Sequence, residues 1–234
     1  TLRTLFEREI PVCFHSQGGW FYGIAHGMAH KNVELRRRQY DVASPPEASL
    51  AIARSLIAGK IRNCRTLLRR NHADAPAAAL AELNRLAEAA SSAASPETLL
   101  GIEGAAGKTY FAHFNGMLRP PAAESLAEFD LDGRNRRPPK DPVNALLSYL
   151  YSLLAKDLTV TTLAVGFDPY LGFFHRPRYG RPALALDLME EFRPIVADST
   201  VLGLINTGDI RPGYFVRGGD AVTMKDAGRK RVIE

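Results

Sequence analysis

Acidic residues interrupt an apolar segment that follows a lone histidine. The segment from Gly172 to Pro194 reads GFFHRPRYGRPALALDLMEEFRP and contains His175, Asp187 and Glu190. Asp187 and Glu190 are three residues apart, so a helix would point both side chains the same way. Carboxylates with one imidazole form a hard, oxygen-rich set that suits Mg²⁺ or Mn²⁺ better than a structural zinc. The pattern alone leaves two alternatives open, namely acids paired with nearby arginines and an ordinary loop histidine.

A further carboxylate, Glu103, falls on the apolar face of a predicted helix. Leu99, Ala106 and Tyr110 share that face at helical spacing. A carboxylate there must be paired, protonated or bound to a metal, because an isolated buried charge is costly. Glycines recur at every third position beside it, at Gly101, Gly104 and Gly107. Since glycine weakens a helix, these positions indicate the close approach of another helix or of a ligand.

Basic residues form three clusters in a chain of net charge +5. The first cluster is Arg54, Lys60, Arg62, Arg65, Arg69 and Arg70, the second is Arg134, Arg136, Arg137 and Lys140, and the third is Arg176, Arg178 and Arg181. Any one cluster could be an ordinary solvated surface, but three together favour contacts with a phosphate backbone. The residues expected to contact DNA are Arg62, Arg65, Arg69, Arg136, Arg137, Arg176, Arg178 and Arg181. No base-reading motif is visible, so binding to shape and backbone is expected.

Helical periodicity dominates the sequence after residue 46. Apolar residues recur at helical spacing within 47–71, at Leu50, Ala53, Ile57, Ile61, Cys64 and Leu68. A second helix is predicted over 76–94. Ser95 followed by Pro96, and Asp141 followed by Pro142, are typical of helix starts. Between these helices, residues 119–141 hold prolines and charges and are predicted to form a loop.

The last long helix is predicted to begin after Pro182 and to carry the acids. Its apolar stripe is expected at Leu184, Leu188, Phe192 and Ile195. Pro194 cannot donate a backbone hydrogen bond to the Glu190 carbonyl, so the helix should be loosened or kinked there. Glu191 is turned about 100° from Glu190 and is expected to face Arg193 or solvent.

The ends of the chain differ from this helical centre. Residues 1–9 can form a short helix, and 10–15 and 20–26 are β-prone runs separated by the turn sequence SQGG. Two strands bury little alone, so we expect them to end a sheet that begins upstream. Their aromatic residues need cover from upstream strands or a dimer mate; these are Phe14, Trp20, Phe21 and Tyr22. Residues 211–234 are polar and lack apolar periodicity.

The predicted fold is therefore mainly α. Residues 1–30 are expected to be the remnant of a small N-terminal β domain, and 31–234 a helical domain with a polar C-terminal tail. A hydrophobic content of 46% allows a sizeable core and argues against disorder. The two cysteines belong to no metal-binding pair, and no signal peptide or membrane-spanning run is visible, so a cytoplasmic protein is expected.

Five stretches of the sequence occur in the order of a known family. They are AGKIRNCRTLLRRN, LLGIEGAAGKTYF, DPVNALLSYLYSLL, GFDPYLGFFH and GRPALALDLMEEFRP. With them, residues 1–210 resemble the CRISPR-associated integrase of spacer acquisition, the Cas-one family. The opening RTLFEREIPVCFHSQGGWFYG is similar to the end of that family's N-terminal β domain. The resemblance implies a helical catalytic domain behind that β domain.

The resemblance also implies the residues of the site. The family's metal ligands match Glu103, His175 and Glu190, the last at a position where some members have aspartate. Asp187 matches a second acidic position and is expected to be a catalytic residue that lies behind the ligands or faces a phosphate. The implied cofactor is Mg²⁺ or Mn²⁺.

The implied activity is the insertion of short DNA fragments into a CRISPR array by attack of a 3′ hydroxyl on a phosphodiester. Water as the nucleophile would give endonuclease activity. The implied partners are double-stranded DNA (prespacer and CRISPR repeat), a second copy of the chain, and a Cas-two protein that bridges two dimers. An upstream nuclease, fused or associated, is a further expected partner, and the implied location is the prokaryotic cytoplasm, with no membrane. Two other classes stay open, namely a non-catalytic DNA-binding scaffold and a helical metal-dependent phosphohydrolase of small phosphoesters.

Overall fold

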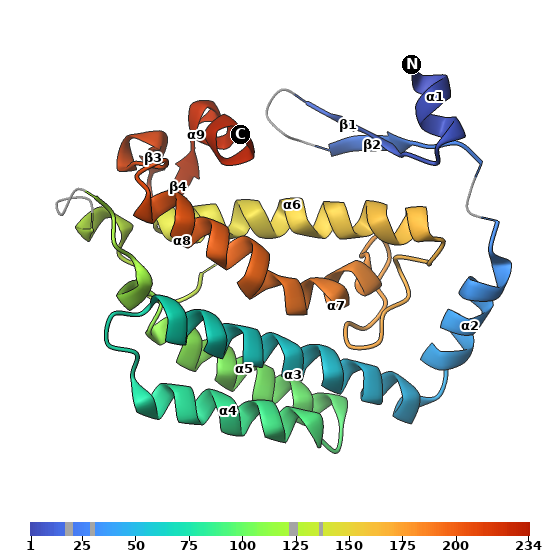
Figure 1. The fold of residues 1–234 in the computed structure, drawn as a ribbon, viewed down its shortest axis with the longest axis horizontal. Coiled ribbons are helices and arrows are strands. Elements are labelled where there is room, and N and C mark those ends of the chain that lie inside the picture. The colour runs from blue at the N-terminus through green and yellow to red at the C-terminus, as the bar shows by residue number, and fades with distance from the viewer. Residues whose placement is uncertain (17–20, 29–30, 122–125, 136–137) are drawn as a thin grey trace. The chain divides into compact units, whose positions relative to one another are not determined.

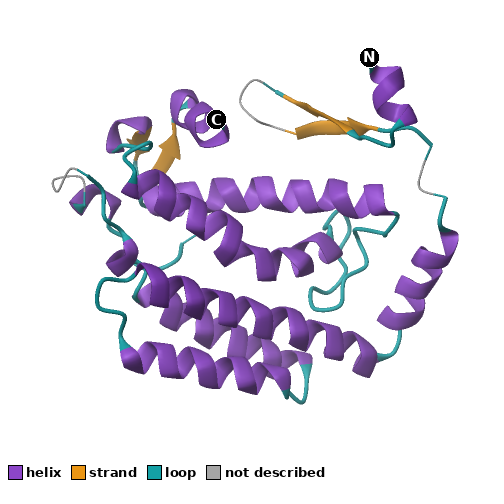
Figure 2. Cartoon of the chain, viewed as in Figure 1, coloured by secondary structure: helices purple, strands orange, loops and turns teal. Residues whose placement is uncertain are grey.

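The structure, a computed structural model, describes residues 1–16, 21–28, 31–121, 126–135 and 138–234. Helices make up most of the described chain, as predicted (Figures 1 and 2). The chain divides into two compact units. Unit 1 comprises Thr1–Ala53 and Leu154–Met189, and unit 2 comprises Arg54–Leu153 and Glu190–Glu234. Within the described ranges, no helix combines the length and hydrophobicity that a membrane crossing requires.

Unit 1 begins with a short helix and a β-hairpin. Its elements are α1 (Leu2–Glu7), β1 (Val12–His15), β2 (Phe21–Ala25) and α2 (Val33–Ala43), followed by the start of α3 (Pro46–Asn71). The strands pair antiparallel with Val12 opposite Ala25, and the register shifts between Phe14 and His15. The predicted hairpin is confirmed, although its turn residues and Trp20 lie outside the described residues. Phe14 and Tyr22 are exposed and Phe21 is half-buried, and their cover by upstream strands or a dimer mate stays a prediction.

Helix α2 was not predicted from the sequence. Its N-cap is Asn32, whose side chain accepts a hydrogen bond from Leu35 N at 3.1 Å. The helix buries one residue, Gln39, rather than an apolar stripe. The Gln39 amide donates to the carbonyls of Asp168 and Leu171, at 2.8 and 2.9 Å. A polar anchor of this kind leaves no hydrophobic periodicity to detect.

Unit 2 is built on helices, and Figure 1 shows α3, α4 (Ala77–Ser91) and α5 (Pro96–Ala112) running side by side. The apolar positions predicted on α3 are all buried: Leu50, Ala53, Ile57, Ile61, Cys64 and Leu68. The predicted caps are confirmed. Ser95 accepts from Thr98 N at 3.2 Å, and Asp141 accepts from Asn144 N at 2.7 Å at the start of α6 (Pro142–Val165).

The helix that carries the acids changes its geometry near Pro194, where a loosened or kinked helix was predicted. Helix α7 (Ala183–Phe192) continues into a π-helix, η4 (Arg193–Asp198), and then into α8 (Ser199–Asn206). Pro194 removes one backbone donor, and the wider π-turn follows at that point. The predicted apolar stripe is wrong in its second half, because Phe192 and Ile195 are 38% and 49% exposed. The buried side of the helix carries charged residues instead.

The last residues form a hairpin and a helix rather than the polar, aperiodic segment expected there. The elements are β3 (Phe215–Gly218), β4 (Ala221–Met224) and α9 (Asp226–Ile233), with short helical turns η1 (Asn115–Met117), η3 (Ala127–Phe129) and η5 (Pro212–Tyr214) elsewhere in unit 2. Val222 and Met224 are buried, and Val222 N donates to the Pro139 carbonyl at 2.8 Å. Four-residue strands are too short to give a clear alternating pattern.

Candidate active site

Glu103 of α5 and Glu190 of α7 meet at one cation in unit 2. The Lys60 ammonium group, from α3, donates to Glu190 Oε2 at 2.6 Å and also to Glu103 Oε1. The second oxygen of Glu190, Oε1, pairs with the Arg193 guanidinium at 2.8 Å. The Glu190 side chain is only 4% exposed. These contacts bring together two of the three predicted metal ligands across 87 residues of sequence (190 minus 103).

Lys60 carries its charge in this environment. Burial alone would lower the pKa of Lys60, but the carboxylates of Glu190 and Glu103 outweigh that effect, so that its pKa is raised. A buried charge is tolerated only with such partners. The sequence pattern included Lys60 only as one member of a basic cluster. Nothing in the local sequence marks its partners, which are 43 and 130 residues away.

Glu191 has a different environment from Glu190. It was expected to face Arg193 or solvent, but its carboxylate lies against Gly59 of α3. A Cβ added at Gly59 would come within 2.9 Å of Glu191 Oε1. The Glu191 carbonyl accepts from Asn63 Nδ2 at 3.0 Å, which ties α7 to α3. Glu191 therefore belongs to the packing of the two helices.

A cavity of about 760 Å³ opens beside Glu103. Its lining includes Lys60, Gly104, Lys108 and Arg193. A Cβ added at any of the three α5 glycines would meet nothing within 4 Å, among the residues that the structure describes. Of the two expected explanations, a helix or a ligand, no described helix approaches these glycines, and Gly104 and Gly107 leave one side of the cavity open, as a ligand would need.

A hydrogen-bond network lines the same cavity. The hydroxyl groups of Tyr110 and Tyr151 donate hydrogen bonds to the two carboxylate oxygens of Asp198, at 3.0 and 2.7 Å. Burial raises the pKa of Asp198 to about 6, although both hydroxyl groups act to lower it. The guanidinium groups of Arg193 and Arg134 lie 5.0 and 5.3 Å from the Tyr151 ring centroid. The sequence patterns did not identify Asp198 as a site residue. The only feature that marks it is an acidic residue inside the apolar run PIVADSTVLGLI.

His175 and Asp187 form a second polar centre, within unit 1. Asp187 is fully buried and accepts three backbone N–H bonds, from Phe173, Phe174 and His175, at 2.5, 2.9 and 2.8 Å. Its Oδ1 also accepts a hydrogen bond from His175 Nδ1 at 2.7 Å. In a neutral ring this leaves the lone pair on Nε2, which is the form that binds a metal. Of the two positions expected for Asp187, the geometry favours the one behind His175 over the one facing a phosphate.

Gly172 makes this arrangement possible. A Cβ at this position would come within 2.6 Å of Asp187 Oδ2 and 2.8 Å of the Ala183 carbonyl carbon. The backbone of the loop can therefore reach the carboxylate only without a side chain here. The G-x-x-H spacing of the sequence has a direct structural cause: glycine admits Asp187, and Asp187 orients His175.

The basic residues of α3 have contacts within the protein. Arg65 Nε donates to the Leu80 carbonyl at 3.0 Å, and Arg62 donates to Ser91 Oγ at 3.4 Å, both on α4. Arg54 donates to the Ala93 carbonyl at 2.7 Å. Arg69 is exposed near the end of the helix. Part of this predicted DNA-binding cluster therefore joins α3 to α4.

The other basic clusters differ in exposure. Arg176 and Arg178 are exposed in the loop after His175, and Arg181 is half-buried. Arg134 donates to Asn144 Oδ1 at 2.6 Å and lines the cavity beside Glu103. Arg136 and Arg137 lie outside the described residues, so their predicted role is unchanged.

The residues fit a divalent cation through their donor chemistry. Two carboxylates, the buried Glu190 and the half-buried Glu103, already converge on a cation in unit 2, and His175 has the ring orientation of a ligand in unit 1. In the described part of the chain, no group of three or more His, Cys, Asp and Glu side chains forms a metal cluster. The convergence of His175 with Glu103 and Glu190 stays a prediction.

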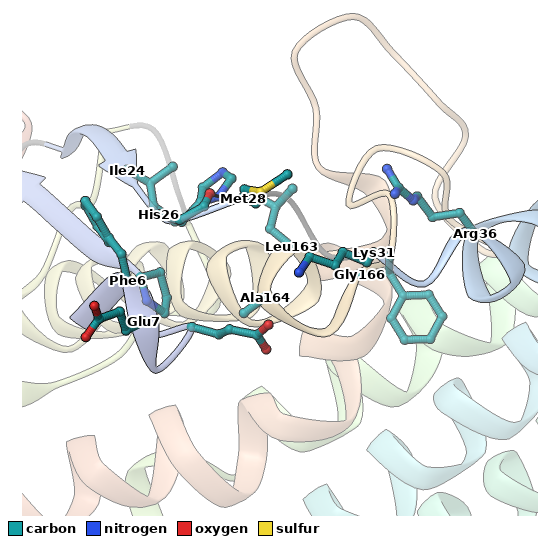
Figure 3. A pocket seen from close by; sticks show the side chains of 14 residues that line it. Phe6, Glu7, Ile24, His26, Met28, Lys31, Arg36, Leu163, Ala164 and Gly166 are labelled. Carbon is teal, nitrogen blue, oxygen red and sulfur yellow. Dashed lines mark hydrogen bonds between the residues drawn. The ribbon is translucent and has the colours of Figure 1, made fainter. Parts of the chain in front are cut away.

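A second cavity, of about 320 Å³, lies within unit 1 (Figure 3). Its lining comes from α1, β2, α2, the C-terminal end of α6 and the loops next to them, and includes Phe6, Glu7, His26, Lys31, Arg36 and Leu163. None of the predicted site residues lines it. Acidic, basic and apolar side chains all line this cavity, so its composition indicates no particular ligand.

Comparison with known proteins decides the family. The family model described as "CRISPR associated protein Cas1" matches residues 1–234. The chain belongs to the Cas1 family. A Cas4/Cas1 fusion of Geobacter sulfurreducens, described as exonuclease and endonuclease, is 52% identical over 238 residues, covering 99% of this chain and 42% of the fusion. A Cas1 endonuclease of Moorella thermoacetica is 43% identical, covering 97% of this chain and 67% of the relative. The chain thus spans about two fifths of the fusion proteins that it matches.

Solved Cas1 structures share the fold. The Cas1 protein TM1797 of Thermotoga maritima is 27% identical with a TM-score of 0.81, covering 99% of this chain and 72% of that chain. A chain of a partial Cas6-RT-Cas1–Cas2 complex is 28% identical with a TM-score of 0.79, covering 99% of this chain and 70% of that one. The resemblance stated from the sequence motifs is confirmed.

Proposed function

We propose that this chain is the catalytic part of a metal-dependent DNA integrase and endonuclease, which inserts short DNA fragments into a CRISPR array. Membership of the Cas1 family supports the reaction class. The observation that carries the proposal for this chain is the meeting of Glu103 and Glu190 at one buried cation, beside an open cavity. Two carboxylates held together in this way form a site that accepts a cation.

Glu103, His175 and Glu190 would hold the Mg²⁺ or Mn²⁺. Such an ion, when bound, activates an attacking oxygen and stabilises charge on a phosphoryl group. Asp187 positions His175 through hydrogen bonds from its backbone N–H and its Nδ1, and so fixes the ring tautomer. Two further bonds, from the backbone of Phe173 and Phe174, hold the loop in place. Asp187 is thus a positioning residue rather than one that contacts DNA.

The reaction exchanges one phosphodiester for another. The 3′ oxygen of the incoming strand forms a bond to a phosphorus atom of the repeat, and the bond from that phosphorus to its own 3′ oxygen breaks. The hydroxyl proton passes to solvent and the leaving oxygen takes one up. With water in place of the 3′ hydroxyl, the same site hydrolyses DNA. The basic residues expected to hold phosphates are Arg62, Arg65, Arg69, Arg136, Arg137, Arg176, Arg178 and Arg181.

The proposed partners follow the family. They are double-stranded DNA as prespacer and repeat, a second copy of this chain, and a Cas2 protein that bridges two dimers. The relative from Geobacter sulfurreducens carries Cas4 and Cas1 in one chain, which supports an upstream nuclease as a fused or associated partner. The name of the solved complex that contains a related chain includes Cas2, which supports Cas2 as a partner. The proposed location is the prokaryotic cytoplasm.

The deciding experiment incubates the protein with supercoiled DNA and a 3′-OH duplex, with and without Mn²⁺. The proposal expects joined products only with Mn²⁺, and none from Glu190→Gln. DNA binding that is equal with and without metal, with no product, would indicate a scaffold. Hydrolysis of small phosphoesters without salt-sensitive DNA binding would indicate a phosphohydrolase.

A further inference from the structure

Lys60 occupies the position between two proposed metal ligands. Its ammonium group bonds to Glu103 and Glu190, and the Lys60 side chain is 11% exposed. A buried lysine in the core of a helix pair is costly to keep unless it has a function or a partner. Here its partners are the two side chains proposed to bind the cofactor.

Among themselves, the four ion-paired side chains of this cluster balance their charges without a metal. Lys60 and Arg193 provide two positive charges, and Glu103 and Glu190 provide two negative ones. A divalent cation on the same carboxylates would leave two positive charges in excess. Since Lys60 would then lie within a few ångströms of that cation, their repulsion would oppose binding.

Lys60 has room to change its partners. It lines the cavity beside Glu103 together with Gly104 and Lys108. Gly104 and Gly107 leave that side open, so an anionic ligand in the cavity can come within reach of the Lys60 ammonium group. A phosphate of DNA has the charge that the cluster lacks once a divalent cation is bound.

We infer that Lys60 is an exchangeable internal counterion, which holds Glu103 and Glu190 together in the free protein and turns to a DNA phosphate when a divalent cation is bound. Metal and DNA then bind cooperatively, because each supplies the charge that the other requires. This inference rests on the proposed function. It adds a specific role for a residue that is not a metal ligand.

The test is a calorimetric titration with Mn²⁺ in the absence of DNA, at pH 7.5. Lys60→Gln keeps hydrogen-bond donors but loses the charge, and should bind Mn²⁺ about tenfold more tightly than wild type or better. Lys60→Arg keeps the charge and should bind as weakly as wild type. Lys108→Gln is the matched control, since this lysine lines the same cavity but is not an ion partner of either glutamate, and should change the affinity by less than about threefold. Equal or weaker Mn²⁺ binding by Lys60→Gln overturns the inference.

A second titration uses a short DNA duplex with 3′-OH ends. Wild type should bind Mn²⁺ about tenfold more tightly with the duplex than without it, and Lys60→Gln should show little of this gain. This wild-type comparison also decides the matter if Lys60→Gln does not fold, because equal affinities with and without DNA overturn the inference. Glu103→Gln separates the two proposals: if it binds Mn²⁺ like wild type, the metal site itself is wrong. If Glu103→Gln loses Mn²⁺ while Lys60→Gln is unchanged, only the role of Lys60 fails.

Discussion

At the scale of single residues, the buried acids of α7 have different partners and therefore different expected roles. Glu190 contacts two cations and lies beside the cavity, whereas Glu191 packs against Gly59. Glu190→Gln keeps the shape and removes the charge, so we expect it to abolish strand transfer and to leave DNA binding within about threefold of wild type. Glu191→Gln removes an equal charge one residue away and should keep most of the activity. A strand-transfer assay on both variants checks this, and an active Glu190→Gln would contradict the assignment.

Asp187→Asn tests a role in positioning. The amide can still accept some of the loop's hydrogen bonds, but it no longer fixes the His175 tautomer through a charged acceptor. Loss of such a partner typically costs about 10–100-fold in metal affinity or activity. We therefore expect strand transfer and Mn²⁺ affinity to fall together by about that factor, with residual activity remaining. Complete loss of activity at unchanged Mn²⁺ affinity would show instead that Asp187 acts on the substrate.

At the scale of elements, α5 carries glycines that no described part of the protein requires. Gly104 is exposed, and an added Cβ would meet nothing within 4 Å. Gly104→Ala should therefore raise the free energy of unfolding by about 0.5–1 kcal/mol through helix propensity alone. If the open face admits DNA, the same variant should also lower DNA affinity. Urea unfolding and a DNA titration measure both quantities, and a stabilised variant with unchanged DNA affinity would remove the ligand explanation for this glycine.

The network of Asp198 joins α5, α6 and η4, and it makes stability depend on pH. The pKa of this acid is raised by burial from 3.8 to about 6, so the folded state binds its proton more tightly than the unfolded state does. The contribution of Asp198 to the free energy of unfolding is therefore fully present at low pH, and it is lost as the pH rises from about 4 to about 6. Asp198→Asn should remove that dependence, and the difference in unfolding free energy between the two proteins should change by up to about 3 kcal/mol. Urea unfolding at several pH values checks this; parallel curves would contradict it.

The elements differ in how far the sequence could predict them. Helix α3 follows from periodicity and α5 from its Ser95-Pro96 start, because both bury a regular apolar face. Helix α2 and the last hairpin do not, since one is held by Gln39 and the other is too short. Glu103 and Glu190 could be named from the motifs alone. Their common partner Lys60 could not, because only the folded chain brings these three helices together.

At the scale of the whole molecule, DNA binding must use charges that the fold leaves available. Arg176 and Arg178 are exposed beside His175, with Arg181 half-buried after them. On α3, Arg62 and Arg69 are exposed as well, but Arg65 is half-buried and bonds to the Leu80 carbonyl at 3.0 Å, and Arg62 bonds to Ser91 at 3.4 Å. An arginine that joins two helices must give up that bond to reach a phosphate. The loop cluster is therefore expected to contribute more to the salt dependence of binding than the helix cluster.

Two triple variants to glutamine test this difference. Changing Arg176, Arg178 and Arg181 should lower the slope of log affinity against log salt by up to about 2.7, since each lost phosphate contact is worth about 0.9. Changing Arg62, Arg65 and Arg69 should lower the slope by less and should also destabilise the fold, because the Arg65 bond joins α3 to α4. Binding to all duplexes should weaken alike, since phosphate contacts carry no base sequence. DNA titrations at several salt concentrations and urea unfolding measure both effects. A larger slope change from the helix cluster, with unchanged stability, would mean that α3 rather than the loop is the main DNA-binding surface.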